Sequence, residues 1–149
     1  MKKKLLVLSA AIALLLSGCS LLNDAKNTLT YVNDAKDYLD KATAFANEAP
    51  SVAKLAVGDQ QAAADFQNML QDMKKEINAF NKLQAPNVAV DLHQQIVDQN
   101  NKLAAGIDVY LKHMKNGLLD PSVLENTEIF QSVQDITNIL NQIKELGQK

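Results

Sequence analysis

The chain has 149 residues, of which 47% are hydrophobic, and it carries 15 basic residues, all of them Lys, against 17 acidic ones. This hydrophobic content excludes a disordered chain, and five Gly and three Pro are few for a β-sandwich with its many turns. Without the first 18 residues, twelve Lys face seventeen acids, a net charge of about −5. Such a surface excludes nucleic acid as the expected partner, because nucleic acid selects basic faces.

The N-terminus has a basic segment followed by an apolar one. Three lysines at positions 2–4 precede a twelve-residue apolar segment at 5–16 that contains one Ser. This segment is too short for a membrane span of about 20 residues and fits a signal peptide. It ends in Leu16, followed by Ser17, Gly18 and Cys19, and these four residues resemble the lipobox of bacterial lipoproteins. The resemblance implies a diacylglyceryl thioether on Cys19 and cleavage before it. It also implies a lipid anchor at the extracytoplasmic face of the cell membrane. An uncleaved anchor helix with an incidental cysteine is the alternative.

This interpretation divides the chain into a signal peptide at 1–18, an anchor and short linker at 19–23, and a helical domain at 24–149. Cys19 is the only cysteine, so no internal disulfide is possible. Lipidation explains a lone cysteine in an exported protein. Leu21 and Leu22 precede the first helix cap, and we expect them to dip into the headgroup boundary.

Four amphipathic helices are predicted in the domain, over 24–48, 60–83, 88–116 and 127–146. Apolar residues recur at spacings of three and four along them. The expected core residues of the last three helices are Phe66, Ile77, Phe80, Ile96, Leu103, Ile107, Val133, Ile136 and Leu140. The expected stripe of the first helix is Leu29, Val32, Leu39, Ala42 and Ala46. Pro50 should end that helix, and no β-strand is predicted.

The connections predict the topology. Asp59 should cap the second helix, residues 84–87 form a loop, Gly117 should stop the third helix, and Asp120 with Pro121 should start a short turn. Helices of similar length joined by short connections predict an all-α fold, an antiparallel up-down four-helix bundle. A helical hairpin array that dimerises to complete its core is the alternative, so a homo-oligomer stays open.

Two sets of residues have more than one interpretation. Tyr31, Tyr38 and Phe45 recur every seven residues, which fits the edge of the core and also the lining of a ligand groove. Asn100 falls inside the apolar stripe of its helix. A buried Asn can specify the register of packed helices, or it can sit where the bundle widens.

No residue pattern for catalysis or metal binding is present. His93 and His113 lie twenty residues apart on one predicted helix, which turns them about 200° from each other and keeps them from sharing a site. Neither follows a Glu by three positions, as di-metal bundles require. Acids such as Asp34, Asp37 and Asp40 indicate a solvated helix face. We therefore expect no enzyme and no cofactor other than the covalent lipid.

Several segments along the chain carry a second resemblance: 17–22, 31–33, 45–50, 83–86, 93–96 and 124–130. Together they are similar to a family of uncharacterised small lipoproteins from bacillus-type Gram-positive bacteria. The resemblance spans essentially the whole chain. It implies an anchor in the outer leaflet of the cytoplasmic membrane and supplies no catalytic residues.

The sequence favours a non-enzymatic envelope lipoprotein whose bundle binds or modulates another envelope protein. A structural or self-associating spacer and a small-ligand carrier with a cavity between helices are the alternatives. A binding module should expose an apolar patch, a carrier should enclose a pocket, and a spacer should show neither. In an up-down bundle, Leu22 and Pro86 should lie nearer the membrane than Val57 and Leu118. The acidic surface should push the domain outward, and connections 50–59 and 117–126 would then face partners.

Overall fold

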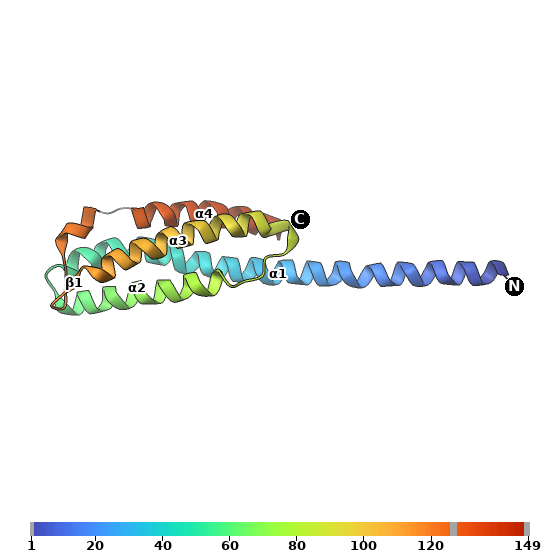
Figure 1. Cartoon of the computed structure of the whole chain (residues 1–149), viewed down its shortest axis with the longest axis horizontal. Helices are drawn as coiled ribbons and strands as arrows, with labels where there is room; N and C mark the ends of the chain where they lie inside the picture. The colour runs from blue at the N-terminus through green and yellow to red at the C-terminus, as the bar shows by residue number, and fades with distance from the viewer. Residues whose placement is uncertain (1, 126–127, 148–149) are drawn as a thin grey trace.

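The computed structural model describes the backbone of residues 2–125 and 128–147 and the side chains of 26–124, 128–129 and 131–147. Its helices are α1 (Lys2–Ala56), α2 (Gln60–Phe80), α3 (Val90–Lys112) and α4 (Glu128–Leu146). Short 3₁₀ helices, η1 (Asn87–Ala89) and η2 (Pro121–Glu125), precede α3 and α4. Figure 1 shows the four helices side by side, with the N-terminal part of α1 continuing beyond the bundle. The predicted all-α bundle is confirmed.

Consecutive helices are neighbours in the bundle. α1 packs against α2 and α4, and α3 packs against α4 and, less extensively, against α2. This arrangement is the up-down topology predicted from the short connections. α3 and α4 approach closely at Gly106, where an added Cβ would overlap with Cγ2 of Ile129. We call the end with the 81–89 connection the proximal end, because α1 leaves the bundle there, and the opposite end the distal end.

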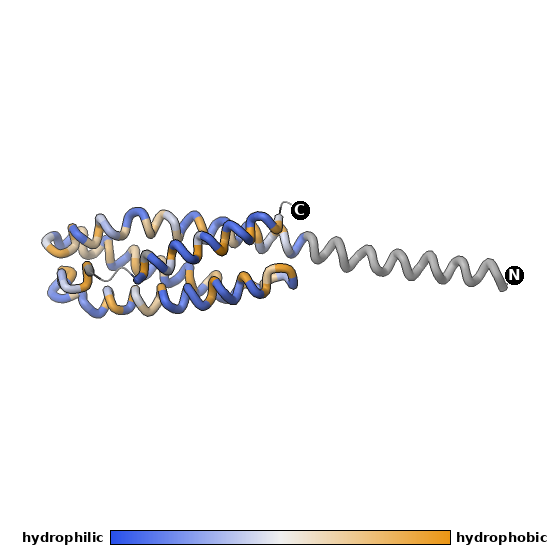
Figure 2. Tube along the Cα trace, turned by 90° about the horizontal axis from the view of Figure 1, so that it is seen from above, coloured by the Kyte–Doolittle hydropathy of each residue, from blue (hydrophilic) through white to orange (hydrophobic). Residues whose placement is uncertain are grey.

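The core matches the prediction for α2, α3 and α4. All nine expected residues are at most 2% exposed, because the spacing of three and four places them on one helix face. Along the helices of the bundle, Figure 2 shows apolar residues alternating with polar ones in the pattern of amphipathic helices.

The predicted stripe of α1 is partly wrong. Leu29 is exposed, and Val32 and Ala46 are only half-buried. Two rows with a seven-residue spacing face the core instead. One row is aromatic, with Tyr31, Tyr38 and Phe45, and the other consists of Ala35, Ala42, Ala49 and Ala56. Small residues let a neighbouring helix approach, and the large rings fill the space beside it. The aromatic row therefore belongs to the core.

α1 is also longer than predicted at both ends. It continues through Pro50 to Ala56, because Ala53 and Ala56 bury their side chains in the core beyond the proline. That burial outweighs the hydrogen bond that Pro50 cannot donate. At the other end, α1 begins at Lys2 and not at residue 24, since Leu and Ala are strong helix formers. Residues 19–23, predicted as the anchor and short linker of the cleaved protein, have a helical backbone in the full-length chain.

A small hairpin replaces the predicted end of the third helix. Strands β1 (Met114–Lys115) and β2 (Leu118–Leu119) pair antiparallel, with Met114 opposite Leu119. Between them, Asn116 and Gly117 both have positive φ angles, of 55° and 77°. An Asn-Gly pair of this kind forms the tight turn that matches the twist of a hairpin. The predictions that the helix reaches residue 116 and that strands are absent were wrong.

The predicted caps are confirmed. Asp59 accepts a hydrogen bond from the Ala62 amide at 2.7 Å at the start of α2. The Asp120 carboxylate accepts hydrogen bonds from the amide and the hydroxyl of Ser122, at 3.0 and 2.7 Å. η2 then begins at Pro121, where the missing N–H of a proline has no cost.

Candidate functional site

A groove follows the face between α1 and α2. Three adjoining hollows of about 320, 210 and 330 Å³ form it. The first and second share Asp34 and Leu83, and the second and third share Lys41 and Glu76. We call the continuous depression the α1–α2 groove. It follows α1 from Asn27 to Glu48, which is about 30 Å at 1.5 Å per helical residue.

The floor of the groove is apolar. α1 contributes Tyr38 and Phe45, and α2 contributes Met73 and Phe80, all of them buried core residues whose edges reach the groove. Met69 and Leu83 are half-buried beside them. Thioethers and aromatic edges adapt to many apolar partners. The floor therefore suits an apolar side chain more than a polar one.

The rim of the groove is acidic. Five carboxylates line it: Asp34, Asp37, Glu48, Asp72 and Glu76. The lysine that lines the groove, Lys41, pairs with Glu76 at 2.7 Å. Among the described side chains, Asp34, Asp37 and Glu48 have no ion-pair partner. The groove is thus negatively charged above an apolar floor.

A cluster of aromatic rings packs behind the proximal half of the groove. The Phe80 ring stacks on Tyr38, with centroids 4.6 Å apart, and on His93, with centroids 5.2 Å apart. The Tyr31 hydroxyl and Nδ1 of His93 share a hydrogen bond of 3.0 Å. Burial lowers the pKa of His93 and raises the pKa of both tyrosines. All three groups are therefore uncharged near neutral pH.

Asn100 connects this cluster to α2. Its side chain is fully buried. Its Oδ1 accepts a hydrogen bond from the Tyr38 hydroxyl, and its Nδ2 donates one to Oδ1 of Asn81 at 2.7 Å. Asn100 could specify the register of the helices or lie where the bundle widens. Its burial, with partners on α1 and at the end of α2, favours a role in helix register.

The structure separates the two histidines. His93 belongs to the aromatic cluster, and His113 lies at the end of α3, with Nδ1 2.8 Å from the Val109 carbonyl. No group of three metal-ligating side chains occurs within the described part of the chain. The side chains of the lipobox residues Leu16, Ser17, Gly18 and Cys19 lie outside the described ones, as do Leu21 and Leu22. Within the described residues, no helix is long and apolar enough to cross a membrane.

The sequence left two interpretations of the aromatic row open, the edge of the core and the lining of a groove. Tyr31, Tyr38 and Phe45 are buried in the core and also line the three hollows. The part of the groove that α2 contributes and its acidic rim were not predicted, because Asp34 and Asp37 were expected on a solvated face. A groove arises only where α1 and α2 pack together, and a single sequence does not show which helix faces meet. The seven-residue aromatic row beside Asp34 and Asp37 was the available signal.

Comparison with known proteins shows the family to which the chain is related. Residues 31–146 match a family of unknown function, DUF6376. The chain belongs to this family. It is also 32% identical over 148 residues to the uncharacterized lipoprotein YybP of Bacillus subtilis (strain 168), covering 99% of this chain and 100% of that protein. No solved structure matches. The resemblance to uncharacterised lipoproteins of bacillus-type bacteria is confirmed.

Proposed function

We propose that the protein is a lipoprotein anchored through Cys19 at the extracytoplasmic face of the cell membrane. Its bundle is a non-enzymatic module that binds another envelope protein. The lipobox at Leu16 to Cys19 and the full-length similarity to a lipoprotein support the anchor. Two acyl chains hold a protein stably on a bilayer, at about 0.8 kcal/mol per buried CH₂.

The α1–α2 groove carries the proposal for binding. An amphipathic helix can lay its apolar side into such a groove and place basic residues against the rim. The length of about 30 Å matches a helix of about 20 residues. Asp34, Asp37 and Glu48 would attract a cationic segment and orient it. The proposed partner is therefore an envelope protein with a Lys- or Arg-rich amphipathic helix.

The shape of the groove favours this function over a small-ligand carrier. A carrier buries most of its ligand in an enclosed pocket. The α1–α2 groove is instead bordered by exposed side chains along its length, including Asn27, Asp34 and Asp37. A long open groove suits a segment of another chain.

Site-directed photocrosslinking in intact cells tests the groove. A photoreactive amino acid at Ala44, on the groove, should crosslink to a partner peptide that is basic and amphipathic. Reversing two rim charges, with Asp37→Lys and Glu48→Lys, should abolish the crosslink by repelling a cationic partner.

The matched control reverses two exposed acids outside the groove, with Asp65→Lys and Asp98→Lys. It changes the net charge equally and should keep the crosslink. A crosslink that survives the groove reversal, or equal loss in both double variants, would contradict the proposal. So would a crosslinked peptide that is acidic or uncharged.

A further inference from the structure

The proximal end of the bundle exposes large apolar side chains. Among the described residues, four large hydrophobic side chains are strongly exposed: Leu29 at 55%, Leu55 at 63%, Val88 at 64% and Val90 at 48%. Leu55 lies at the distal end of α1, and the other three lie at the proximal end. Val88 is in η1, within the 81–89 connection, and Val90 is the first residue of α3 directly after it. We call Val88 and Val90 the proximal patch.

The proximal patch lies close to the point where α1 leaves the bundle. A hollow of about 330 Å³ is lined by Asn27 and Thr28 of α1 on one side and by Pro86 and Val88 on the other. Val88 therefore lies at the level of Asn27 along α1, and Val90 follows two residues later at the start of α3. Figure 1 shows the same connection at the end from which α1 projects.

The helical backbone of α1 fixes the distance from this patch to Cys19. About eight residues separate Cys19 from Asn27, which is roughly 12 Å along a helix. The headgroup layer of a bilayer is about 5–7 Å thick on each side. With the acyl chains of Cys19 in the bilayer, an upright α1 would hold the patch just outside the headgroups. A tilted α1 would lower it into them.

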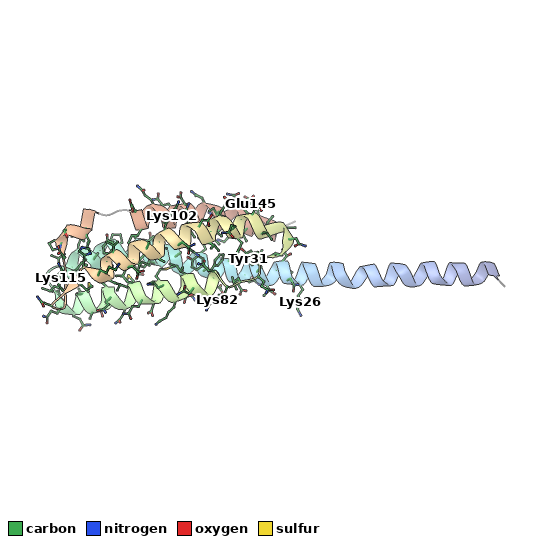
Figure 3. The ribbon with its side chains drawn as sticks, in the orientation of Figure 1. Lys26, Tyr31, Lys82, Lys102, Lys115 and Glu145 are labelled. Carbon is green, nitrogen blue, oxygen red and sulfur yellow. The ribbon has the colours of Figure 1, made fainter. Side chains whose placement is uncertain are left out.

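The charges of the proximal end allow it to approach anionic headgroups. Lys26 and Lys82 lie there, and Figure 3 shows them at that end together with Glu145. Lys144 is in the last turn of α4. These three lysines offset Asp91, Glu145 and also Asp34, which lines a hollow with residues of the 81–89 connection. The proximal end is thus not acidic as a whole, and the uniform repulsion expected from the net charge does not act on it. Lysines near anionic headgroups favour the contact through electrostatic attraction.

From this geometry we propose that the proximal patch contacts the outer surface of the bilayer, with Val88 and Val90 in the headgroup region and the bundle tilted. Removing the apolar area of these two side chains from water would stabilise the contact. The proposal rests on the lipid anchor of the proposed function and is independent of the groove.

Tryptophan fluorescence tests the contact directly. The chain contains no Trp, so Val88→Trp introduces a single indole at an exposed position. The lipidated mature protein is reconstituted in phosphatidylcholine and phosphatidylglycerol vesicles, with or without bromine on the acyl chains near the glycerol. The Val88→Trp variant should show blue-shifted emission that brominated lipid quenches. The matched control, Leu55→Trp, places the indole at a similarly exposed apolar position at the distal end and should show neither effect.

Vesicle flotation of the same samples separates the two proposals. If the Val88→Trp variant floats with the vesicles but its emission is not quenched, the anchor stands and the contact is overturned. Equal quenching in both variants would also overturn it. If neither variant floats, the anchor fails and the contact fails with it.

Discussion

At the scale of single residues, Asn100 shows how this core tolerates a polar group. Its carboxamide is fully buried, but both of its polar atoms are hydrogen-bonded, to Tyr38 and to Asn81. A buried polar atom without a partner costs about 1–3 kcal/mol. The three side chains therefore depend on one another. A shifted packing of α3 against α1 and α2 would break both bonds at once.

His93 gives the core a dependence on pH. Burial lowers its pKa below the ordinary value of 6.5, so the folded protein binds a proton less readily than the unfolded chain. The contribution to stability is complete above pH 6.5 and is lost as the pH falls through that value toward the folded pKa. In urea unfolding, we expect the midpoint of the wild-type protein to fall more between about pH 7.5 and 5.5 than the midpoint of His93→Phe.

The His93→Phe variant keeps a ring against Phe80, and the Tyr31 hydroxyl loses its partner at both pH values. Carboxylates titrate in both proteins, so their effect cancels in the comparison. An equal fall of the two midpoints would show that His93 is not the responsible group.

Residue periodicity predicted much of the core but not all of it. The stripes of α2, α3 and α4 could be predicted because each is formed by large aliphatic or aromatic residues at helical spacing. The face of α1 was harder, since its core side alternates large rings with alanines such as Ala35 and Ala42. Alanine occurs on buried and exposed faces alike, so it does not identify the core side of a helix. The stripe was therefore predicted to include the more hydrophobic Leu29, which is exposed.

At the scale of elements, Pro50 is a weak point inside α1. A proline in a helix interior lacks the N–H that would bind the carbonyl four residues earlier, and its ring crowds that carbonyl. Burial of Ala49, Ala53 and Ala56 around it keeps the helix intact. Local propensity therefore predicted an end that tertiary packing overrides.

Replacing this proline should stabilise the protein. We expect Pro50→Ala to raise the free energy of unfolding by about 1–3 kcal/mol, because it restores a helix hydrogen bond and removes the ring clash. Chemical denaturation measures this. Pro86→Ala is the matched control, because Pro86 lies in the loop before η1 with a φ of −65° that suits proline. It should instead destabilise by up to about 1 kcal/mol. A loss of stability in Pro50→Ala would contradict the argument.

The sequence contains a signal for the β1–β2 hairpin. Asn116 and Gly117 form the strongest short-range hairpin signal, but a glycine after a helical pattern is equally typical of a helix end. Only the residues around it decide between the two. Here Leu119 becomes buried when β2 folds back on β1, which a helix ending at Gly117 would not achieve.

At the scale of the whole molecule, short connections were enough to predict the up-down topology, because a short loop forces consecutive helices to be antiparallel neighbours. The α1–α2 groove could not be predicted in this way. The groove depends on how α1 and α2 are each rotated about their own axes. If α1 were rotated so that Leu29 faced the core, other acids would lie beside α2.

Lipidation of Cys19 should decide the location of the whole molecule. We expect Cys19→Ala to abolish incorporation of a fatty-acid analogue and to release the protein or leave it as an unprocessed precursor. Labelling of growing cells followed by fractionation measures both. Ser20→Ala, one residue beyond the lipobox, should label normally. Undiminished labelling of Cys19→Ala would exclude the assigned anchor.

The helical backbone that joins Cys19 to the bundle has a consequence for encounter rates. A flexible tether would let the groove sample a thick shell above the membrane, whereas a helix of about 12 Å confines it to a thin layer. For the proposed anchor, a cationic partner in the same membrane would meet the groove by lateral diffusion at a high effective concentration, which tethering raises without any new contact. Even a weak affinity between the groove and a cationic segment would suffice for occupancy there, while the same segment free in solution would hardly bind.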